Sequence, residues 1–326
     1  MSRPSLSVIL PTRNHAHLVG RAIDAIGTQS WQPIELMVVD DASTDDTPAV
    51  LAALAKKYPF MRVLRNEKNL GVAGAANLAL SLVTGAFIYG AASDDWVLPG
   101  AFAKAMAIAA EYPQAGVVCG AMLMLRRQPL LLAARSWTRP LYAPPDVFVR
   151  EYLEVEGPGF ALGGATFFRR EPFLALGGLR RELGSFCDTF AFRALGATYG
   201  AGYVPEPLMV WNVLPESFSQ ATARDPRNYL GIIERVAALM RSEPFCRVFP
   251  PQHTDRWERE FREEILATGL APLEKAVEQI ISCRPLVGGD RGRRLALDVL
   301  EPLVDSLSSS IVARVRARLE LKGREG

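Results

Sequence analysis

The sequence contains few of the residues that build metal clusters and disulfide frameworks. It has 326 residues, of which four are cysteine and three are histidine. The cysteines are widely spaced: Cys119, Cys187, Cys246 and Cys283. This spacing lacks a zinc motif and argues against a disulfide framework, so a reducing cytosol fits best. His15 and His17 lie close together near the N-terminus and are interpreted as solvated loop residues.

The sequence also lacks an excess of charge and a long apolar run. Its 37 Lys and Arg residues face 35 Asp and Glu residues, which gives a formal net charge of +2 and no global reason to expect nucleic acid as a partner. The longest apolar candidate, residues 116–125, is shorter than the about 18 residues of a membrane span. Residues 6–11 are too short for the apolar part of a signal peptide. We therefore expect a cytoplasmic protein that at most lies peripherally on a membrane.

Two glycine-rich nucleotide-binding motifs are missing after the first predicted strand. No G-x-G-x-x-G follows that strand, which disfavours an NAD-dependent dehydrogenase. A glycine-rich loop with a lysine, as in nucleotidyltransferases, is missing there too. The chain has Pro11-Thr12-Arg13-Asn14 at this place, so both enzyme classes are disfavoured.

The sequence does have a regular alternation of apolar strands and amphipathic helices, in a chain that is 49% hydrophobic. Strands are predicted at residues 5–10, 34–39, 61–64, 86–89 and around 117–118. Helices are predicted at residues 18–26, 45–57, 71–82 and 100–111. This order is typical of parallel βαβ units, so the predicted fold class is α/β.

The second half of the chain is less regular. Residues 126–158 are rich in proline and are predicted as a loop that contains a helix at 147–153. The elements expected after it are a strand at 165–168, helices at 171–176 and 189–195, and a strand at 202–204. Beyond about residue 224 the apolar residues recur at helical spacing. We therefore divide the chain into a domain of residues 1–223 and an all-helical C-terminal region of residues 224–326.

Two acidic turns at the ends of predicted strands are the most informative feature. Asp40 and Asp41 follow the second strand, and Asp94 and Asp95 follow the fourth. Adjacent carboxylates repel each other, so each pair needs a cation or hydrogen-bond donors. An open α/β sheet binds its ligands beyond the carboxyl ends of the strands. Together the turns predict a nucleotide held with a divalent metal, and Asp-capped loops are the alternative.

Four segments of the first half form a recognisable series: Ser7–Asn14, Ile34–Asp45, Asn69–Asn77 and Ser93–Gly100. In order and approximate spacing they resemble the family 2 glycosyltransferases, and the resemblance covers roughly residues 5–215. It implies a GT-A fold, with a Rossmann-like, mixed but mostly parallel sheet flanked by helices. It also implies an enzyme that moves a sugar from a nucleotide-diphosphate donor to an acceptor hydroxyl with inversion.

The resemblance assigns several residues to the donor. Pro11, Thr12 and Arg13 form the turn that walls the base and ribose, and a Pro-initiated turn fixes backbone polar groups for a flat base. Asp41 matches the residue that accepts the N3–H of a uracil-type base, so a UDP-sugar is favoured. Asn77 is placed near the ribose or diphosphate, and packing of its helix against the sheet is the alternative.

The second acidic turn matches the family's metal-binding signature. Asp95 is expected to bind Mn²⁺ or Mg²⁺, since both ions accept carboxylate and phosphate oxygens. Such an ion would take up charge on the leaving diphosphate. Asp94 is expected to hold the ribose or to orient the metal, beside Ser93, where the family more often has a third acid. The chain also lacks an arginine that many relatives carry near Ala76.

The resemblance places the catalytic base in an acidic motif before a helix. Asp188 matches this position and is expected to deprotonate the acceptor hydroxyl. It could instead cap the helix at 189–195, and Glu182 is the alternative base. Gly164 matches the acceptor side, where glycine allows the backbone to approach the sugar or pyrophosphate. Another acid is usual in place of Cys187, so a nucleotide-sugar-binding protein without catalysis is the alternative function.

The acceptor and the role of the C-terminal helices stay open. A glycan, a lipid-linked molecule or another hydroxyl compound fits as acceptor, and polysaccharide biosynthesis is the expected context. Residues 211–219 match a lid that orders when the donor binds. The basic segment at 311–326 fits a solvated helix face, contact with an anionic membrane, or a homo-oligomer.

Overall fold

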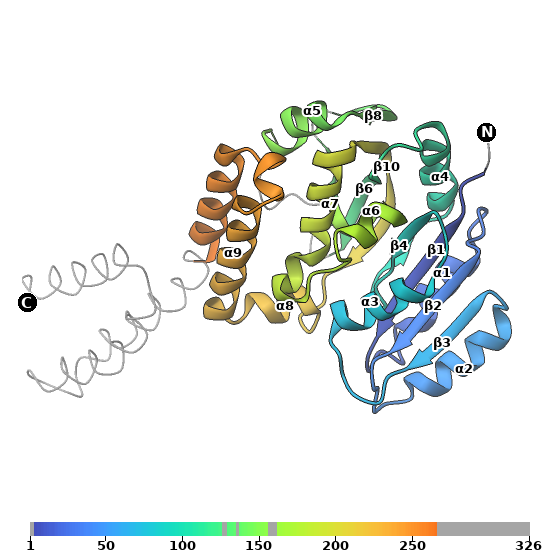
Figure 1. Ribbon diagram of the computed structural model, residues 1–326. Coiled ribbons are helices and arrows are strands. Elements are labelled where there is room, and N and C mark those ends of the chain that lie inside the picture. Colours follow the sequence, from blue (N-terminus) through green and yellow to red (C-terminus); the bar gives the residue numbers. More distant parts are fainter. Residues whose placement is uncertain (1–2, 126–128, 135–136, 156–161, 266–326) are drawn as a thin grey trace, which may run out of the picture.

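A mixed sheet with strand order β3-β2-β1-β4-β9-β6-β10-β5 forms the centre of the molecule, and helices cover both of its faces (Figure 1). The computed structural model describes residues 3–125, 129–134, 137–155 and 162–265. Along this order four neighbouring pairs are parallel (β3–β2, β2–β1, β1–β4 and β6–β10) and three are antiparallel. The predicted α/β architecture with a mixed, mostly parallel sheet is therefore confirmed.

The first half of the chain supplies four adjacent parallel strands. They are β1 (Leu6–Thr12), β2 (Glu35–Asp40), β3 (Met61–Arg65) and β4 (Phe87–Gly90). Parallel neighbours need crossover connections, and three helices provide them: α1 (Val19–Gly27), α2 (Thr47–Lys57) and α3 (Val72–Leu82). Because β1 lies between β2 and β4, the loops that follow these three strands meet at one edge of the sheet.

The second half of the chain makes the sheet mixed. Strand β9 (Thr166–Arg169) runs antiparallel between β4 and β6 (Val117–Leu125). Strand β10 (Ala201–Asn212) is parallel to β6, and the short β5 (Trp96–Val97) is antiparallel to β10. The helices that belong to this half of the sheet are α4 (Ala101–Glu111), α6 (Arg170–Ala175) and α7 (Cys187–Tyr199).

Two hydrophobic clusters fill the two faces of the sheet. In β1, Val8 and Leu10 belong to one cluster and Ile9 to the other, as the two-residue period of a strand requires. One cluster includes buried residues of α1 and α4. The other includes those of α3, α7 and α9 (Pro226–Arg241). Because both faces are covered, the central strands are apolar along most of their length.

The first strand continues through Pro11, where the sequence predicts a turn. The carbonyl of Thr12 accepts an N–H from the β2 side, and that of Ile9 accepts an N–H from the β4 side. Residues of a parallel strand alternate between their two neighbours, so Pro11 faces β4, which ends at Gly90 opposite Ile9. Its missing N–H therefore has no strand to bond, and the proline is tolerated.

The described residues between 129 and 155 are more structured than the sequence predicts. Two short strands lie there, β7 (Leu130–Leu132) and β8 (Leu141–Ala143), followed by α5 (Pro145–Phe148) and a π-helical turn, η1 (Val149–Leu153). Strand β7 pairs with β6, and β8 pairs with β10. Three-residue strands have too little periodicity to be recognised, and it is the partner strands that order them. Likewise β10 continues to Asn212, so the first two residues of the predicted lid belong to the sheet.

The described part of the C-terminal region is helical, as predicted. It consists of α9, a 3-10 turn, η4 (Phe245–Arg247), and a helix at 251–265, and the short α8 (Phe218–Ala223) precedes it. Phe186, just before α7, contacts the rings of Trp257 and Phe261, so these helices share a core with the sheet domain. Within the described ranges, no helix is both long and apolar enough to cross a membrane. The predicted basic helix at 311–326 lies outside the described residues.

Candidate active site

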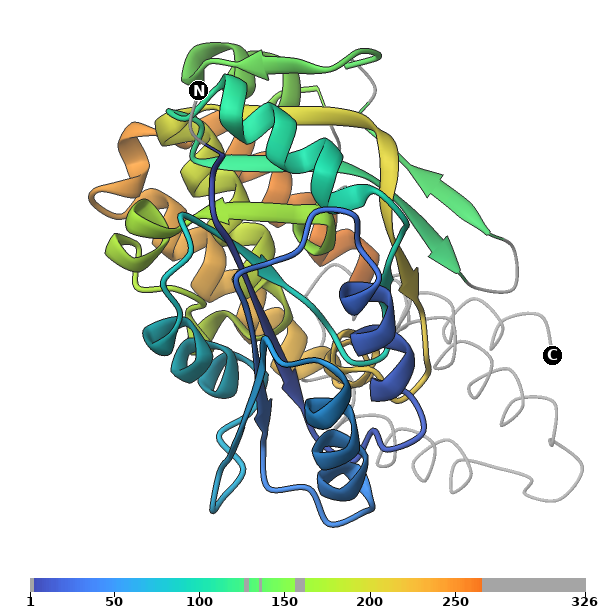
Figure 2. The same ribbon diagram turned by 90° about the vertical axis from the view of Figure 1, so that its right-hand side faces the viewer.

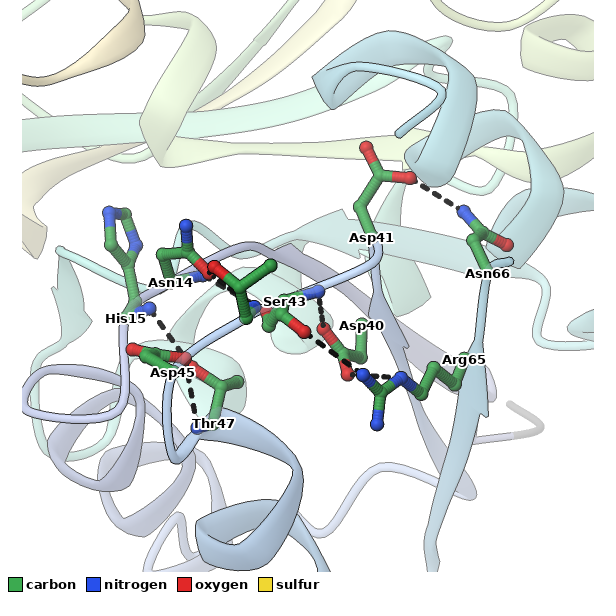
Figure 3. Close-up of polar contacts among 10 residues, drawn as sticks. Asn14, His15, Asp40, Asp41, Ser43, Asp45, Thr47, Arg65 and Asn66 are labelled. Atoms are coloured by element: carbon green, nitrogen blue, oxygen red, sulfur yellow. Dashed lines mark hydrogen bonds and ion pairs between the residues drawn. The ribbon is translucent and has the colours of Figure 1, made fainter. Parts of the chain in front are cut away.

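The loops that follow β1, β2 and β3 lie together at the carboxyl edge of the parallel strands (Figure 3). Hydrogen bonds join the first two of these loops. The N–H of Asp41 donates to the carbonyl of Thr12 at 2.8 Å, which joins the loop after β2 to the end of β1. The N–H of Asn14 donates to Oγ of Ser43 at 3.0 Å, and Oδ1 of Asn14 accepts the N–H of Thr44 at 2.8 Å. The first acidic turn is therefore held rigidly against the loop after β1.

The carboxylates of Asp40 and Asp41 point to opposite sides of their loop (Figure 3). Asp40 is buried, and its Oδ1 accepts the N–H of Ser43 at 3.0 Å. Its Oδ2 lies 3.5 Å from Nε of Arg65. Asp41 faces the other way, toward Asn66. Donors and a cation from the protein itself therefore offset the repulsion within this pair.

The carboxylate of Asp41 holds the start of α3. Its Oδ1 accepts Nδ2–H of Asn66 at 2.7 Å and the N–H of Leu70 at 2.8 Å, and its Oδ2 accepts the N–H of Gly71 at 2.8 Å. Gly71 is the N-cap of α3 and has a φ of 75°, which glycine adopts without strain. The carboxylate also meets the positive end of the helix dipole. A carboxylate has about four acceptor positions, so one is left for the N–H of a base.

Asp95 lies in a different environment at the end of the second acidic turn. Its Oδ1 accepts the N–H of Asn212, at the end of β10, at 2.7 Å. Burial and the neighbouring charge of Asp94 raise the pKa of Asp95 to about 8. The N–H of Asn212 and the guanidinium of Arg21 oppose this shift more weakly. The Cζ atom of Arg21 stacks 3.7 Å from the ring centre of Trp96, which keeps the guanidinium beside the turn. The protein thus compensates the ionised carboxylate of Asp95 only in part.

The metal that the resemblance implies fits this turn together with a donor diphosphate. A nearby cation favours the ionised form of a carboxylate, which is the form that burial disfavours at Asp95. In the described parts of the chain, no group of three or more His, Cys, Asp or Glu side chains could hold an ion. The protein therefore offers Asp95 and its neighbour Asp94, and phosphate oxygens would complete the coordination.

His15 links the loop after β1 to the second acidic turn, which the sequence analysis missed. Its Nδ1 lies 2.6 Å from Oγ of Ser93, and its backbone N–H donates to Oγ1 of Thr47 at 3.0 Å. Figure 3 shows its ring on the same side of the loops as the carboxylate of Asp41. The signal in the sequence was Ser93 in a place where the family more often has an acid, because a serine hydroxyl can either donate to or accept from an imidazole nitrogen.

The residues predicted to bind the nucleotide base lie at the carboxyl end of β1. Pro11 and Thr12 are the last residues of β1, and Arg13 follows them as an exposed residue. Thr12 is buried, and within the described part of the protein its Oγ1 has no hydrogen-bond partner. Pro11 and Thr12 therefore shape the edge as strand residues instead of turn residues.

Asp188 is the second residue inside α7 and does not cap it. The N-cap position is Phe186, and no side chain makes a capping bond there, so the predicted capping alternative is wrong. Oδ1 of Asp188 accepts the N–H of Thr189 at 2.7 Å, and a Cβ on Gly163 would stand 2.8 Å from its Oδ2. Burial raises the pKa of Asp188, opposed by the N–H of Thr189 and the charge of Arg193. A raised pKa makes the carboxylate a stronger proton acceptor.

Gly164 and Glu182 are the other residues predicted for the acceptor side. Gly164 belongs to the 3-10 turn η2 (Gly163–Ala165), and a Cβ on it would make only an ordinary contact at 3.5 Å. The close contact is made by its neighbour Gly163, where any side chain would collide with the carboxylate of Asp188. Glu182 is exposed, and its Oε1 is 3.3 Å from Nη1 of Arg180.

The side chain of Asn77 forms hydrogen bonds with the backbone just before η3 (Arg181–Phe186). Its Nδ2–H donates to the carbonyl of Leu179 at 2.7 Å, and its Oδ1 accepts the N–H of the same residue at 2.8 Å. Arg181 then donates from Nη2 to the carbonyl of Leu70 at 2.8 Å and lies beside Gly74. Arg181, from a remote part of the sequence, therefore lies against α3, where the sequence shows no arginine.

An open sheet of this topology, with acidic turns at its carboxyl edge, defines a nucleotide-binding fold of the GT-A type. Two solved structures share it. Residues 1–349 of S. aureus TarS, in complex with UDP-GlcNAc, align over 95% of this chain and 83% of that chain, with 15% identity and a TM-score of 0.65. The mannosyltransferase PcManGT from Pyrobaculum calidifontis, in complex with GDP-Man and Mn²⁺, aligns over 91% of this chain and 84% of that chain, with 22% identity and a TM-score of 0.57.

The sequence family agrees with this fold. The model of glycosyl transferase family 2 matches residues 7–176, and the chain belongs to this family. The uncharacterized glycosyltransferase YibD of Escherichia coli (strain K12) is 30% identical over 110 residues, which are 34% of this chain and 32% of that protein. A Campylobacter jejuni protein, GalNAc(5)-diNAcBac-PP-undecaprenol beta-1,3-glucosyltransferase, is 36% identical over 104 residues, 32% of this chain and 34% of that protein. The match thus spans about a third of the length of these curated relatives.

Proposed function

We propose that this chain transfers a sugar from a nucleotide-diphosphate donor to an acceptor hydroxyl, with inversion and with the help of a divalent metal. The observation that supports this best is the environment of Asp95. Its carboxylate has one N–H partner from Asn212 and a pKa of about 8, beside loops suited to a nucleotide. Such a group gains most from a divalent cation, and the ion would supply charge neutralisation at the leaving diphosphate.

For the donor, we propose a UDP-sugar. TarS has been crystallised with UDP and with UDP-GlcNAc, whereas PcManGT was crystallised with GDP-Man, so the base is inferred from Asp41 and not from the fold. Asp41 would accept the N3–H of uracil with its remaining acceptor position. Pro11, Thr12 and Arg13 would line the base and ribose. Asp94 and Ser93 would contact the ribose or orient the metal, and Asn77 would keep the neighbouring chain in place.

For the chemical step, we propose Asp188 as the base. Inversion requires one carboxylate that takes the proton of the acceptor hydroxyl as its oxygen attacks the anomeric carbon in line. The raised pKa of Asp188 and its position against Gly163 suit that role, because the carboxylate is rigidly held and basic. Gly164, on the same turn, would border the acceptor. Mn²⁺ or Mg²⁺ would be held by Asp95.

For the acceptor, we propose a glycan or a lipid-linked saccharide in polysaccharide biosynthesis. The Campylobacter relative carries an undecaprenol-linked acceptor in its name, and another relative is a chondroitin synthase of Pasteurella multocida. We also propose a cytoplasmic location, because the nucleotide-sugar donor would be available there.

The substitution Asp188→Asn tests the proposed base. It should lower kcat by about 1,000-fold, since general-base catalysis contributes typically 10² to 10⁴. Donor affinity, measured by calorimetry with UDP-sugar and Mn²⁺, should change less than about twofold because Asp188 does not touch the donor loops. Glu182→Gln is the matched control and should keep normal turnover. A normal kcat for Asp188→Asn, or a large loss for Glu182→Gln, would contradict the assignment.

A nucleotide-sugar-binding protein without catalysis is the second candidate, and one observation favours it. Cys187 stands in the place of a usual second acid, and burial raises the pKa of its thiol, so it stays neutral. Donor hydrolysis separates the two functions: a binder shows affinity for the nucleotide sugar and no release of nucleotide, with or without acceptor sugars. An enzyme releases nucleotide at a rate that Asp188→Asn abolishes.

A further inference from the structure

The loop between β1 and α1, which are the darkest blue strand and helix of Figure 2, contacts both acidic turns. The N–H of Asn14 donates to Oγ of Ser43, two residues after Asp41, at 3.0 Å. The next residue, His15, contacts the other turn, where its Nδ1 lies 2.6 Å from Oγ of Ser93. Two consecutive residues of one loop thus bridge the turn proposed for the base and the turn proposed for the metal.

The ring of His15 is held in place, and one of its two nitrogen atoms is left for a ligand. The backbone N–H of His15 donates to Oγ1 of Thr47 at 3.0 Å, which anchors the loop. The side chain is half-buried, and its bond to Ser93 leaves Nε2 without a hydrogen bond to the described residues. Figure 3 shows the ring on the same side of the loops as the carboxylate of Asp41. Nε2 therefore belongs to the side of the edge where the base is proposed to bind.

The chemistry of a neutral imidazole favours a hydroxyl as the ligand of Nε2. Such a ring has one N–H donor and one acceptor, and the bond to Ser93 decides which nitrogen is which. If the hydroxyl of Ser93 donates to Nδ1, Nε2 carries the proton and donates; if the hydroxyl accepts, Nε2 is an acceptor. A sugar hydroxyl can donate and accept, so it pairs with either form, whereas a phosphate oxygen only accepts.

The place of His15 between the turns selects the ribose among the hydroxyl-bearing parts of the donor. In the proposed function the base lies at Asp41 and the diphosphate at Asp95, so the ribose that joins them spans the interval between the two turns. We propose that Nε2 of His15 binds a ribose hydroxyl of the nucleotide, and that Ser93 holds the ring for this contact. His15 is thus a specificity residue for ribonucleotides over deoxynucleotides. The inference rests on the proposed nucleotide donor, and it is independent of the sugar and of the catalytic base.

Calorimetry of the full chain with UDP, 2′-deoxy-UDP and 3′-deoxy-UDP, each with MnCl₂, tests this contact. The wild type should bind one of the two deoxynucleotides about tenfold more weakly than UDP, which is the effect of one lost hydrogen bond. His15→Ala should lose about the same factor for UDP and nothing for that deoxynucleotide, because the contact is already missing there. The ratio between the two affinities should therefore fall from about ten to about one. A merely structural role of His15 would weaken all three nucleotides equally.

The matched control is His17→Ala, which removes the other imidazole of the same loop, an exposed ring 6.4 Å from that of His15. It should keep the tenfold ratio. Equal affinity of the wild type for all three nucleotides would overturn the inference without any variant, and so would an unchanged ratio in His15→Ala. Both results would leave the proposed donor class standing. If the wild type bound none of the three nucleotides, the proposed function would fail together with the inference.

Discussion

The two acidic turns look alike in the sequence, and the structure gives them opposite environments. Asp40 and Asp41 both have partners within the protein, and Asp41 accepts three N–H groups. Asp95 accepts one N–H and is pushed toward its neutral form by burial and by Asp94. The first turn braces the sheet edge, and the second holds a buried carboxyl group whose ionised form the protein compensates only in part.

The difference arises from what packs against each turn. After β2, the side chains of Arg65 and Asn66 and the start of α3 bring donors to the carboxylates. After β4, the turn faces Arg21, whose guanidinium stacks on the ring of Trp96, and the end of β10. A pair of adjacent aspartates is therefore not in itself a metal site. What makes one is a shortage of protein donors around a buried carboxylate.

The largest expected effect comes from Asp95→Asn. Because the neutral amide cannot offset the charge of a divalent ion, Mn²⁺-dependent donor affinity should fall about 1,000-fold, that is about 4 kcal/mol. Calorimetry with UDP-sugar, with and without MnCl₂, measures it. Asp41→Asn is the control from the other turn, and it should leave the ratio between the two conditions unchanged. If Asp95→Asn kept the Mn²⁺ dependence, the metal role would belong elsewhere.

The next effect concerns stability. Asp41→Ala should lower the free energy of unfolding by about 3 kcal/mol, since three donors lose their acceptor at about 1 kcal/mol each. Asn66→Ala removes one of these bonds and should cost about 1 kcal/mol. Urea denaturation at constant pH measures both. Equal losses for the two variants would show that the carboxylate of Asp41 does not brace α3.

A smaller effect should appear in the pH dependence of stability without metal. The pKa of Asp95 is about 8 in the folded protein, against 3.8 for an ordinary aspartate, so between these pH values the folded state holds a proton that the unfolded state releases. Stability from this group is present below about pH 4 and is lost as the pH rises toward about 8. Asp95→Asn should therefore gain stability relative to the wild type as the pH rises from about 4 to about 8, because its neutral side chain does not lose a proton. A variant that is no more stable there than the wild type would contradict the burial of this charge.

The smallest effect should come from the link between the turns. Removing the bond between His15 and Ser93 with Ser93→Ala or His15→Ala should cost about 1 kcal/mol. A double-mutant cycle should give a coupling energy of about 0.5–1 kcal/mol. Thermal unfolding of the four proteins measures it. Additive losses would mean that the two turns are held independently.

Much of the fold followed from local pattern. Alternating apolar strands and helices gave the βαβ units, and the carboxyl-edge rule placed both acidic turns together. The pattern did not predict β7 and β8, because these short strands form only through pairing with β6 and β10. It also predicted a turn at Pro11, because it does not show which neighbouring strand this residue faces. It also placed the start of the helix around Asp188 two residues too late, at 189 instead of Cys187, because the start of a helix depends on backbone geometry that a single polar residue does not reveal.

The sequence by itself determined the α/β class, the family and the two acidic turns, because periodicity and short motifs are local properties. Only the tertiary structure decided which carboxylate is satisfied. Asp41 finds Asn66 and the start of α3, while His15 reaches Ser93 across 78 residues of chain. Burial and hydrogen bonding depend on groups far apart in sequence, so the charge state of Asp95 could be read only from the folded chain.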